Sequence, residues 1–292
     1  MRLIIIGGSG AIGHALASTA RQAGYPVIST AITRATSDDQ IFDLTRTPLT
    51  RLVPDLGPGD CVYLLAAHIN PDWVLAHQTQ ARQLNVEASI QALKHIQACG
   101  ARAVFLSTEL VFSGTKGAYT EQDPVAPSTK YGTYKVEVER YILQHCHNTT
   151  IARSGWVVTW RQQDHCPVRN TYRALLQGDA RMATDNQFTI TSISDSVQLL
   201  LQLAEASAHP IYHIVSEPVS SAQIATWVMS DSEQHHNMTY QPIRFSSLTF
   251  KENRPRQPWM DNQRTCAEFQ HTFTAAKDIV QRKTQLLDQW RI

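Results

Sequence analysis

The stretch IIIGGSGAIG, residues 4–13, decides the fold of this chain. It joins an apolar run to three spaced glycines, and a helical pattern over 11–23 follows at once. A strand, a glycine turn and a helix N-terminus together form an anion site, because unpaired backbone N–H groups and the positive end of the helix dipole face a pyrophosphate. The stretch therefore predicts a dinucleotide site, with a flexible turn that binds nothing as the alternative. The residues assigned to this site are Gly7, Gly10, Ala11, Ile12 and Gly13.

Short apolar runs alternate with helical spacing through the first 160 residues. Strands that are apolar on both faces and separated by helices indicate a parallel sheet covered on both sides, with right-handed crossovers. We therefore predict an α/β fold of the Rossmann type, with a doubly wound parallel sheet. The expected strands are 2–7, 25–30, 61–67, 102–108 and 150–158, and the expected helices are 11–23, 78–98 and 129–146.

The alternation loosens after about residue 160. We predict a dinucleotide-binding domain over 1–160 and a smaller C-terminal substrate-binding lobe over 161–292, with elements such as 194–215 returning to the first domain. The elements expected here are helices over 170–178, 194–206, 221–230 and 274–288, a strand over 211–215, and mostly loop over 233–262.

Composition excludes several classes of partner. Charged residues make up 17% of the 292 residues and the net charge is +1, which disfavours nucleic acid and anionic membranes and favours a small-molecule partner. The N-terminal apolar run is too short for a signal sequence or a membrane span. Five scattered cysteines disfavour a disulfide framework, so we expect a cytoplasmic protein. The 12 histidines do not converge at metal-binding spacing, and we expect no metal site.

The end of the second predicted strand bears on the choice of dinucleotide. An Asp or Glu there would accept the ribose hydroxyls of NAD and repel the 2′-phosphate of NADP. The segment VISTAITR, 27–34, has no carboxylate; it offers the hydroxyl of Thr30 and the cation of Arg34. This favours NADPH over NADH, although Arg34 could equally be a solvated loop residue.

The segment YGTYK, 131–135, places a phenol and an amine on one face of a predicted helix. A nearby ammonium favours the phenolate, by an attraction on the order of 4 kcal/mol at ~4 Å and an effective dielectric of ~20. Alone, Tyr131 and Lys135 could be an exposed surface pair. Their position behind the glycine turn, and behind Ser107 and Thr108 at the end of a predicted parallel strand, favours a catalytic pair instead.

In this order the motifs resemble the extended short-chain dehydrogenase/reductase superfamily and, within it, the dTDP-4-dehydrorhamnose reductase (RmlD-like) family over nearly the full chain. Beside the glycine turn, the similar segments are FDL (42–44), LLAAH (64–68), LNVEAS (84–89), STELVFSG (107–114), YGTYKVEVE (131–139), ARSGWVV (152–158), TDNQFTITSISD (184–195) and NRPRQPWMDN (253–262).

The resemblance implies reduction of a keto-deoxysugar nucleotide by NADPH or NADH. Thr108 would bind the substrate carbonyl, Tyr131 would donate a proton to it, and Lys135 would hold the nicotinamide ribose and lower the pKa of the tyrosine. Asp43 would contact the adenine, and Trp156 would pack on the sugar unless it is a core tryptophan. The further cofactor contacts implied are Leu44, Ala66, Ala67, His68 and Ser107, and the further substrate contacts are Glu109 and Arg254.

Three departures leave the exact sugar open. Glu109 replaces an aspartate, Tyr134 stands where a small residue is usual, and Ile190 stands where proline is frequent. An epimerase or dehydratase of the same superfamily and a non-catalytic, cofactor-binding regulatory subunit are the alternative functions. A homodimer is also left open.

Overall fold

The computed structural model describes residues 1–33, 35–205, 207–234, 236 and 238–290. Contacts divide the chain into two compact units. The expected boundary at 160 lies instead after Arg153, and 113–123 is part of the second unit. The first unit comprises Met1–Phe112, Pro124–Arg153 and Val197–Tyr212, and the second comprises Ser113–Asp123, Ser154–Ser196 and His213–Ile292.

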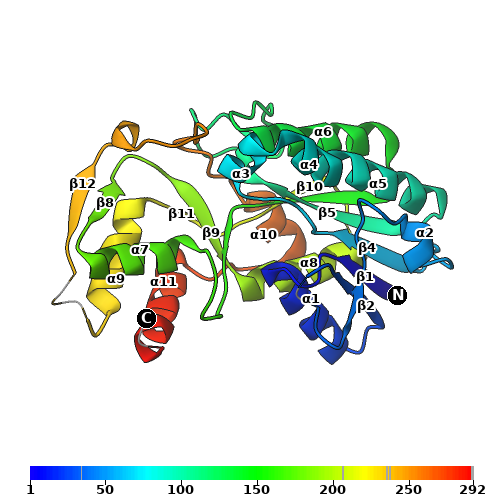
Figure 1. The fold of residues 1–292 in the computed structure, drawn as a ribbon, viewed down its shortest axis with the longest axis horizontal. Helices are drawn as coiled ribbons and strands as arrows, with labels where there is room; N and C mark the ends of the chain where they lie inside the picture. The colour runs from blue at the N-terminus through cyan, green and yellow to red at the C-terminus, as the bar shows by residue number, and fades with distance from the viewer. Residues whose placement is uncertain (34, 206, 235, 237, 291–292) are drawn as a thin grey trace. The chain divides into compact units, whose positions relative to one another are not determined.

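A seven-stranded sheet in the order β10-β6-β5-β4-β1-β2-β3 carries the fold (Figure 1). β1 pairs in parallel with β2 and β4, β2 with β3, and β4 with β5. The chain leaves β1 toward β2 and later returns to β4 on its other side, so the strand order reverses between β1 and β4. This confirms the predicted doubly wound Rossmann-type sheet. The strands are β1 Arg2–Ile6, β2 Val27–Ala31, β3 Asp39–Ile41, β4 Asp60–Leu64, β5 Arg102–Thr108, β6 Thr149–Ser154 and β10 Ile211–Ile214.

Helices cover both faces of this sheet. Figure 1 shows α5 and α6 on one face and α1 on the other. The central strands are apolar on both faces for this reason: Leu3 to Ile6 of β1 are at most 2% exposed. The helices that accompany the sheet are α1 Ala11–Gln22, α2 Leu49–Leu52, α3 Pro71–Ala76, α4 Gln78–Arg82, α5 Ser89–Ala98, α6 Lys130–His145 and α8 Ile193–Glu205.

The helix expected over 78–98 contains an irregular turn. Between α4 and α5 the chain forms a π-helix, η1 Gln83–Ala88, which places the side chain of Asn85 inward at 1% exposure. Single π-turns inside α-helices occur frequently at functional sites. Apolar periodicity did not reveal this turn, nor the short α3 before it.

The predicted strand over 150–158 is wrong in its extent. β6 ends at Ser154, and after Gly155 the chain starts β7, Trp156–Val158, which pairs with β9 in a different sheet. The two strands differ in their partners and not in their pattern, so the sequence alone could not separate them.

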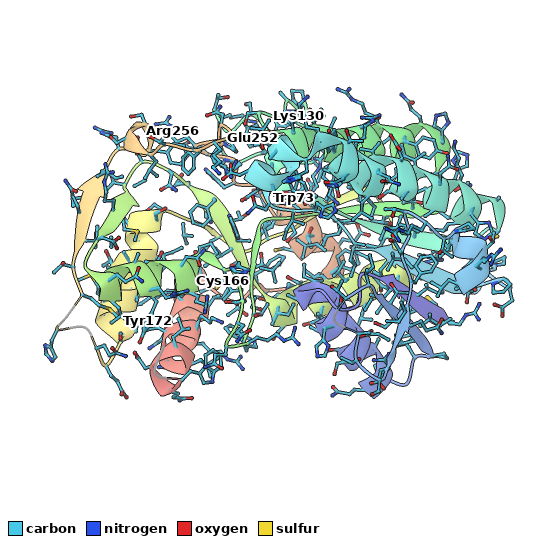
Figure 2. All side chains as sticks on the ribbon, viewed as in Figure 1. Trp73, Lys130, Cys166, Tyr172, Glu252 and Arg256 are labelled. Carbon is cyan, nitrogen blue, oxygen red and sulfur yellow. The ribbon has the colours of Figure 1, made fainter. Side chains whose placement is uncertain are left out.

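The described part of the second unit contains two small sheets and the helices α7, α9, α10 and α11. β7 and β11 flank β9, β12 pairs with β8, and α7, α9 and α11 enclose an apolar core. Tyr172, labelled on α7 in Figure 2, donates its hydroxyl to Asp288 of α11 at 2.6 Å. The predicted helices 170–178, 221–230 and 274–288 are confirmed. The elements are α7 Pro167–Gln177, β8 Ala180–Ala183, β9 Phe188–Ser192, β11 Pro218–Val219, α9 Ser221–Asp231, β12 Tyr240–Ile243, α10 Gln263–Phe269 and α11 Ala276–Gln289, with 3-10 turns at η2 Glu109–Val111 and η4 Phe245–Ser247.

Over the described ranges, no helix is both long enough and apolar enough to cross a bilayer.

A buried ion pair ties α6 to β6 in the first unit. Arg153 and Glu139 approach to 2.7 Å with side chains 3% and 2% exposed, and Ser107 donates its hydroxyl to the same carboxylate at 2.5 Å. The partly exposed pair Arg82–Glu137, at 2.6 Å, ties α4 to the same helix. The two pairs differ in burial, so they should differ in their contribution to stability.

We expect Arg153→Met to lower the free energy of unfolding by about 3 kcal/mol, because it leaves a buried carboxylate without its counter-charge. Arg82→Met, the control, should cost less than about 1 kcal/mol, because its pair is screened by solvent. Urea unfolding of both variants measures the difference, and equal losses would show that burial does not set the contribution of these pairs.

Candidate active site

The glycine turn lies directly against the end of β4, at the point where the strand order reverses. Gly7 has φ of 100°, and a Cβ on it would stand 2.7 Å from the backbone nitrogen of Ala66. Ala66 in turn donates its N–H to the carbonyl of Ile6 at 2.9 Å. Only glycine combines this backbone conformation with so close an approach. The turn is therefore held at the edge of the sheet where doubly wound folds bind ligands.

Thr30 supports this turn from β2. Its hydroxyl accepts the N–H of Gly7 at 3.2 Å and donates to the carbonyl of Ile5 at 3.2 Å, and the residue is 1% exposed. The sequence assigned Thr30 to the cofactor; in the structure its hydroxyl is engaged by the backbone around the turn. Arg34, the other residue assigned there, lies outside the described residues.

The start of α1 fits a phosphate group. No side chain caps the helix at Gly10, and its first turn, with Ala11 and Ile12, has no acidic residue. A Cβ on Gly13 would stand 2.2 Å from the carbonyl oxygen of Gly7, so the turn can fold this tightly only with glycine there. Backbone N–H groups at such a helix start favour an anion, and a dinucleotide pyrophosphate fits them.

Asn85 fixes the chain after β4. Its side-chain oxygen accepts the N–H of His68 at 2.8 Å, and its amide nitrogen donates to the carbonyl of His68 at 2.8 Å. The imidazole of His68 stacks on Trp73, with ring centroids 4.1 Å apart. Burial lowers the pKa of His68. Asn85 therefore holds the backbone that follows Ala66 and Ala67 beside the glycine turn. Trp73 packs on this segment through His68, a contact that no sequence pattern indicated.

The loop after β3 is ordered by Asp43. Its carboxylate accepts the N–H and the hydroxyl of Thr45 at 2.9 and 2.6 Å and lies 3.3 Å from the guanidinium of Arg46. Leu44 packs against the core of the first unit. These contacts place Asp43 and Leu44 in the same unit as the glycine turn; the adenine contact stays a prediction.

Tyr131 and Lys135 lie on the buried face of α6. They are 7% and 3% exposed, and the ammonium of Lys135 lies 5.9 Å from the centre of the Tyr131 ring. The same ammonium donates to the carbonyl of Leu106 at 2.6 Å and lies 4.4 Å from the centre of the Phe105 ring. The pair is therefore not a solvated surface pair.

Gly132 brings the start of α6 onto the turn after β5. A Cβ on it would stand 2.1 Å from the carbonyl oxygen of Leu110. Leu110 donates its N–H to the hydroxyl of Thr108 at 3.2 Å, and Thr108 and Glu109 are both buried. The close approach of Gly132 thus packs the first turn of α6, which contains Tyr131, against the turn that follows Thr108.

The structure changes the electrostatic argument for Tyr131. Burial raises the pKa of its hydroxyl, whereas the sequence argument had Lys135 lowering it. Burial also lowers the pKa of Lys135 to about 7, against the opposing effect of Glu139. The expectation of a lowered tyrosine pKa is wrong here, because the cost of burying the charged phenolate dominates. A phenol with a raised pKa stays protonated and is suited to donate a proton.

Ser107 and Tyr134 have packing roles in the first unit. The hydroxyl of Ser107 donates to Glu139, as described above, and this occupies the residue assigned to the cofactor. Tyr134 is 6% exposed and donates its hydroxyl to the carbonyl of Gln78 at 3.3 Å. The departure from a small residue at 134 therefore changes the core of this unit.

Trp156 and Arg254 belong to the second unit. Trp156 is 46% exposed, which excludes the alternative of a core tryptophan. Arg254 donates to the carbonyl of Glu252 at 3.1 Å, and its guanidinium lies 5.7 Å from the centre of the Phe250 ring. Across the described residues, no three His, Cys, Asp or Glu side chains gather in a way that could hold a metal ion.

Two relatives with different names are similar to parts of this chain. Methionine adenosyltransferase 2 subunit beta of Rattus norvegicus is 31% identical over 153 residues, or 52% of this chain and 46% of that protein, so the match spans less than half of its length. dTDP-4-dehydrorhamnose reductase of Mycobacterium tuberculosis (strain CDC 1551 / Oshkosh) is 26% identical over 229 residues, covering 75% of this chain and 71% of that protein.

Solved structures share the fold. The dTDP-4-dehydrorhamnose reductase of Bacillus anthracis str. Ames, in complex with NADP, superposes with a TM-score of 0.83 at 19% identity, over 96% of this chain and 97% of that one. The family model described as RmlD substrate binding domain matches residues 1–288. With nearly the whole length matched, and with the motifs that suggested the resemblance in place, the chain belongs to the RmlD substrate binding domain family.

Proposed function

We propose that this protein is an NAD(P)H-dependent reductase of a keto-deoxysugar nucleotide. The observation that carries the proposal is the buried Tyr131–Lys135 pair, on a helix that packs against the turn after Thr108 in the same unit as the glycine turn. The name of the reductase relative and the NADP in the Bacillus anthracis structure support it.

The glycine turn and the start of α1 bind the pyrophosphate of the cofactor through backbone N–H groups. When bound, the reduced dinucleotide supplies the hydride. The hydroxyls of Thr108 and Tyr131 hydrogen-bond the substrate carbonyl, and as negative charge builds on its oxygen Tyr131 donates its proton there. In water-poor surroundings such donors stabilise the developing alkoxide far better than they would in water.

The positive charge of Lys135 stabilises the product of this proton transfer. After the transfer, the phenolate of Tyr131 is a buried anion, and a protonated Lys135 nearby offsets the cost of that charge. The ammonium is held in place by the carbonyl of Leu106, and α6 itself is anchored by the Arg153–Glu139 pair. Lys135 also contacts the nicotinamide ribose in this proposal.

Substrate recognition is assigned to three residues in this proposal. The buried Glu109 follows Thr108, and the exposed ring of Trp156 offers a face for the sugar. Arg254 contacts the diphosphate of the nucleotide sugar. We further propose that the enzyme works in the cytoplasm and leave a homodimer as its candidate assembly.

A non-catalytic subunit is the second candidate. It is favoured by one observation: the relative named as a subunit of methionine adenosyltransferase is 31% identical, against 26% for the relative named as a reductase. In that case the chain would bind the dinucleotide and a methionine adenosyltransferase, and it would reduce no sugar nucleotide. Size-exclusion chromatography with such an enzyme, beside an assay of dinucleotide oxidation, separates the two candidates.

We expect the protein to oxidise NADH or NADPH with a dTDP-4-keto-6-deoxyhexose, and Tyr131→Phe to lower kcat at least about a hundredfold because the proton donor is lost. The affinity for the dinucleotide should not change. Steady-state absorbance at the reduced nicotinamide band and fluorescence titration measure the two quantities.

Tyr134→Phe is the matched control, since it removes a hydroxyl from the same helix that bonds only the Gln78 carbonyl. It should leave kcat within about threefold, well short of the loss expected for a proton donor. The proposal is wrong if no keto-sugar nucleotide turns over while dinucleotide binds, or if Tyr131→Phe is as active as Tyr134→Phe.

The lowered pKa of Lys135 has a measurable consequence. Its native value of about 7 lies below the ordinary 10.5, so between these values the unfolded chain holds a proton that the native chain does not. The contribution of Lys135 to the free energy of unfolding therefore rises with pH across this window.

We expect one lysine 13Cε resonance to titrate near pH 7 and to be missing in Lys135→Arg. Lys130→Arg, which alters the exposed lysine at the start of the same helix, should leave that resonance in place. A lysine spectrum in which every resonance titrates above about pH 10, as free lysine does, would contradict the effect of burial on Lys135.

A further inference from the structure

We propose that the carboxylate of Asp39 reads the adenosine ribose and makes NADH, and not NADPH, the dinucleotide of this chain. The inference rests on the proposed function, because it assumes that the glycine turn binds a dinucleotide. Asp39 lies on β3, beyond the segment 27–34 in which a carboxylate for NAD would be expected from the sequence.

Asp39 reaches the glycine turn from β3. β3 pairs in parallel with β2 so that Asp39 lies opposite Ser29, and Ser29 donates its hydroxyl to the Asp39 carboxylate at 2.5 Å. A Cβ on Gly8 would stand 1.8 Å from the Ser29 hydroxyl and 3.1 Å from the Asp39 carboxylate. The two side chains therefore lie against the second glycine of the turn, where the backbone comes nearest to β2.

A cavity of about 220 Å³ opens at this place. Its lining includes Gly8, His14, Arg21, Ser29, Thr36 and Asp39. In a Rossmann fold the pyrophosphate lies on the glycine turn and the adenosine ribose follows it toward the end of the second strand. The cavity borders the glycine turn at Gly8, so in this proposal the ribose that follows the pyrophosphate enters it and its 2′ position meets Asp39.

The charge of the cavity is set by its acidic groups. Partial burial works against ionisation, yet hydrogen bonds from Ser29 and Thr36, helped by the charge of Arg21, hold the pKa of Asp39 below its ordinary value. The guanidinium of Arg21 donates to the carbonyl of Asp38 at 3.0 Å and lies 3.8 Å from the carboxylate of Asp38. Among the described residues of the lining, two carboxylates, Asp38 and Asp39, accompany one guanidinium, Arg21, so negative charge is in excess there.

A carboxylate at this place separates the two dinucleotides. Among the described residues, Ser29 alone donates to one oxygen of Asp39, and this oxygen can accept a second hydrogen bond from a ribose 2′-hydroxyl. A 2′-phosphate would bring about two negative charges to the same carboxylate, and these like charges would repel it. The residue therefore has the role usually taken by an acid at the end of the second strand, supplied here by the next strand of the sheet.

The test compares dissociation constants of NADH and NADPH by nicotinamide fluorescence. We expect NADH to bind at least about ten times more tightly, and Asp39→Asn to bring the two constants within about threefold by tightening NADPH. Asparagine keeps the shape of the side chain: its amide oxygen can accept from Thr36, and its NH2 can donate to the Ser29 hydroxyl in place of the bond that Ser29 now donates. If Asp39→Asn fails to fold, Asp39→Ser makes the same comparison.

Asp55→Asn is the matched control. It removes the same charge from an exposed carboxylate that pairs with Arg2, away from the cavity, and should leave the ratio unchanged. ADP-ribose and its 2′-phosphate, measured by calorimetry, should show the same preference as the whole dinucleotides.

Each other outcome overturns the inference in a distinct way. NADPH binding as tightly as NADH, in a chain that still reduces keto-sugar nucleotides, overturns the role of Asp39 and leaves the proposed function standing. An unchanged ratio in Asp39→Asn shows that another group discriminates. Binding of neither dinucleotide overturns the proposed function and this inference together.

Discussion

The close packing of the glycine turn against the end of β4 is the constraint on which the rest of this structure depends. Gly7 can meet Ala66 only because it has no side chain and adopts a positive φ. That contact holds the glycine turn at the edge of the sheet where doubly wound folds bind ligands, with the start of α1 directly after it. Thr30 and Asn85 hold the two sides of it from β2 and from the π-turn.

Burial sets the protonation of the proposed catalytic pair. Tyr131 and Lys135 share a helix face as the spacing indicated, but their enclosure in the first unit shifts both pKa values toward the neutral forms. In the proposed function, the neutral phenol of Tyr131 donates a proton to the substrate. The amine of Lys135, which can gain a proton near neutral pH, supplies the positive charge beside the resulting phenolate. The same enclosure explains why α6 carries a buried ion pair and a glycine at 132, since both fix the helix tightly against β5 and β6.

Much of the fold could be predicted from the sequence, because its apolar runs have the lengths of buried parallel strands and its glycines follow the first of them directly. β3 could not, since its three residues are polar or exposed and owe their strand to pairing with β2. For the same reason the sequence did not indicate Asp39, because a carboxylate for NAD would be expected only at the end of β2. The break at Gly155 and the π-turn at Asn85 could not be predicted either. Both depend on contacts with residues far away in the sequence and not on the local sequence pattern.

The central claim is that a dinucleotide held by the glycine turn passes a hydride to a sugar carbonyl beside Tyr131. Isotope transfer tests it most directly. With NADH carrying deuterium at both C4 positions and a dTDP-4-keto-6-deoxyhexose, mass spectrometry of the sugar nucleotide should show one deuterium on the carbon that was the carbonyl. A reduced sugar without deuterium, or no reduced sugar while the dinucleotide remains bound, would contradict the account.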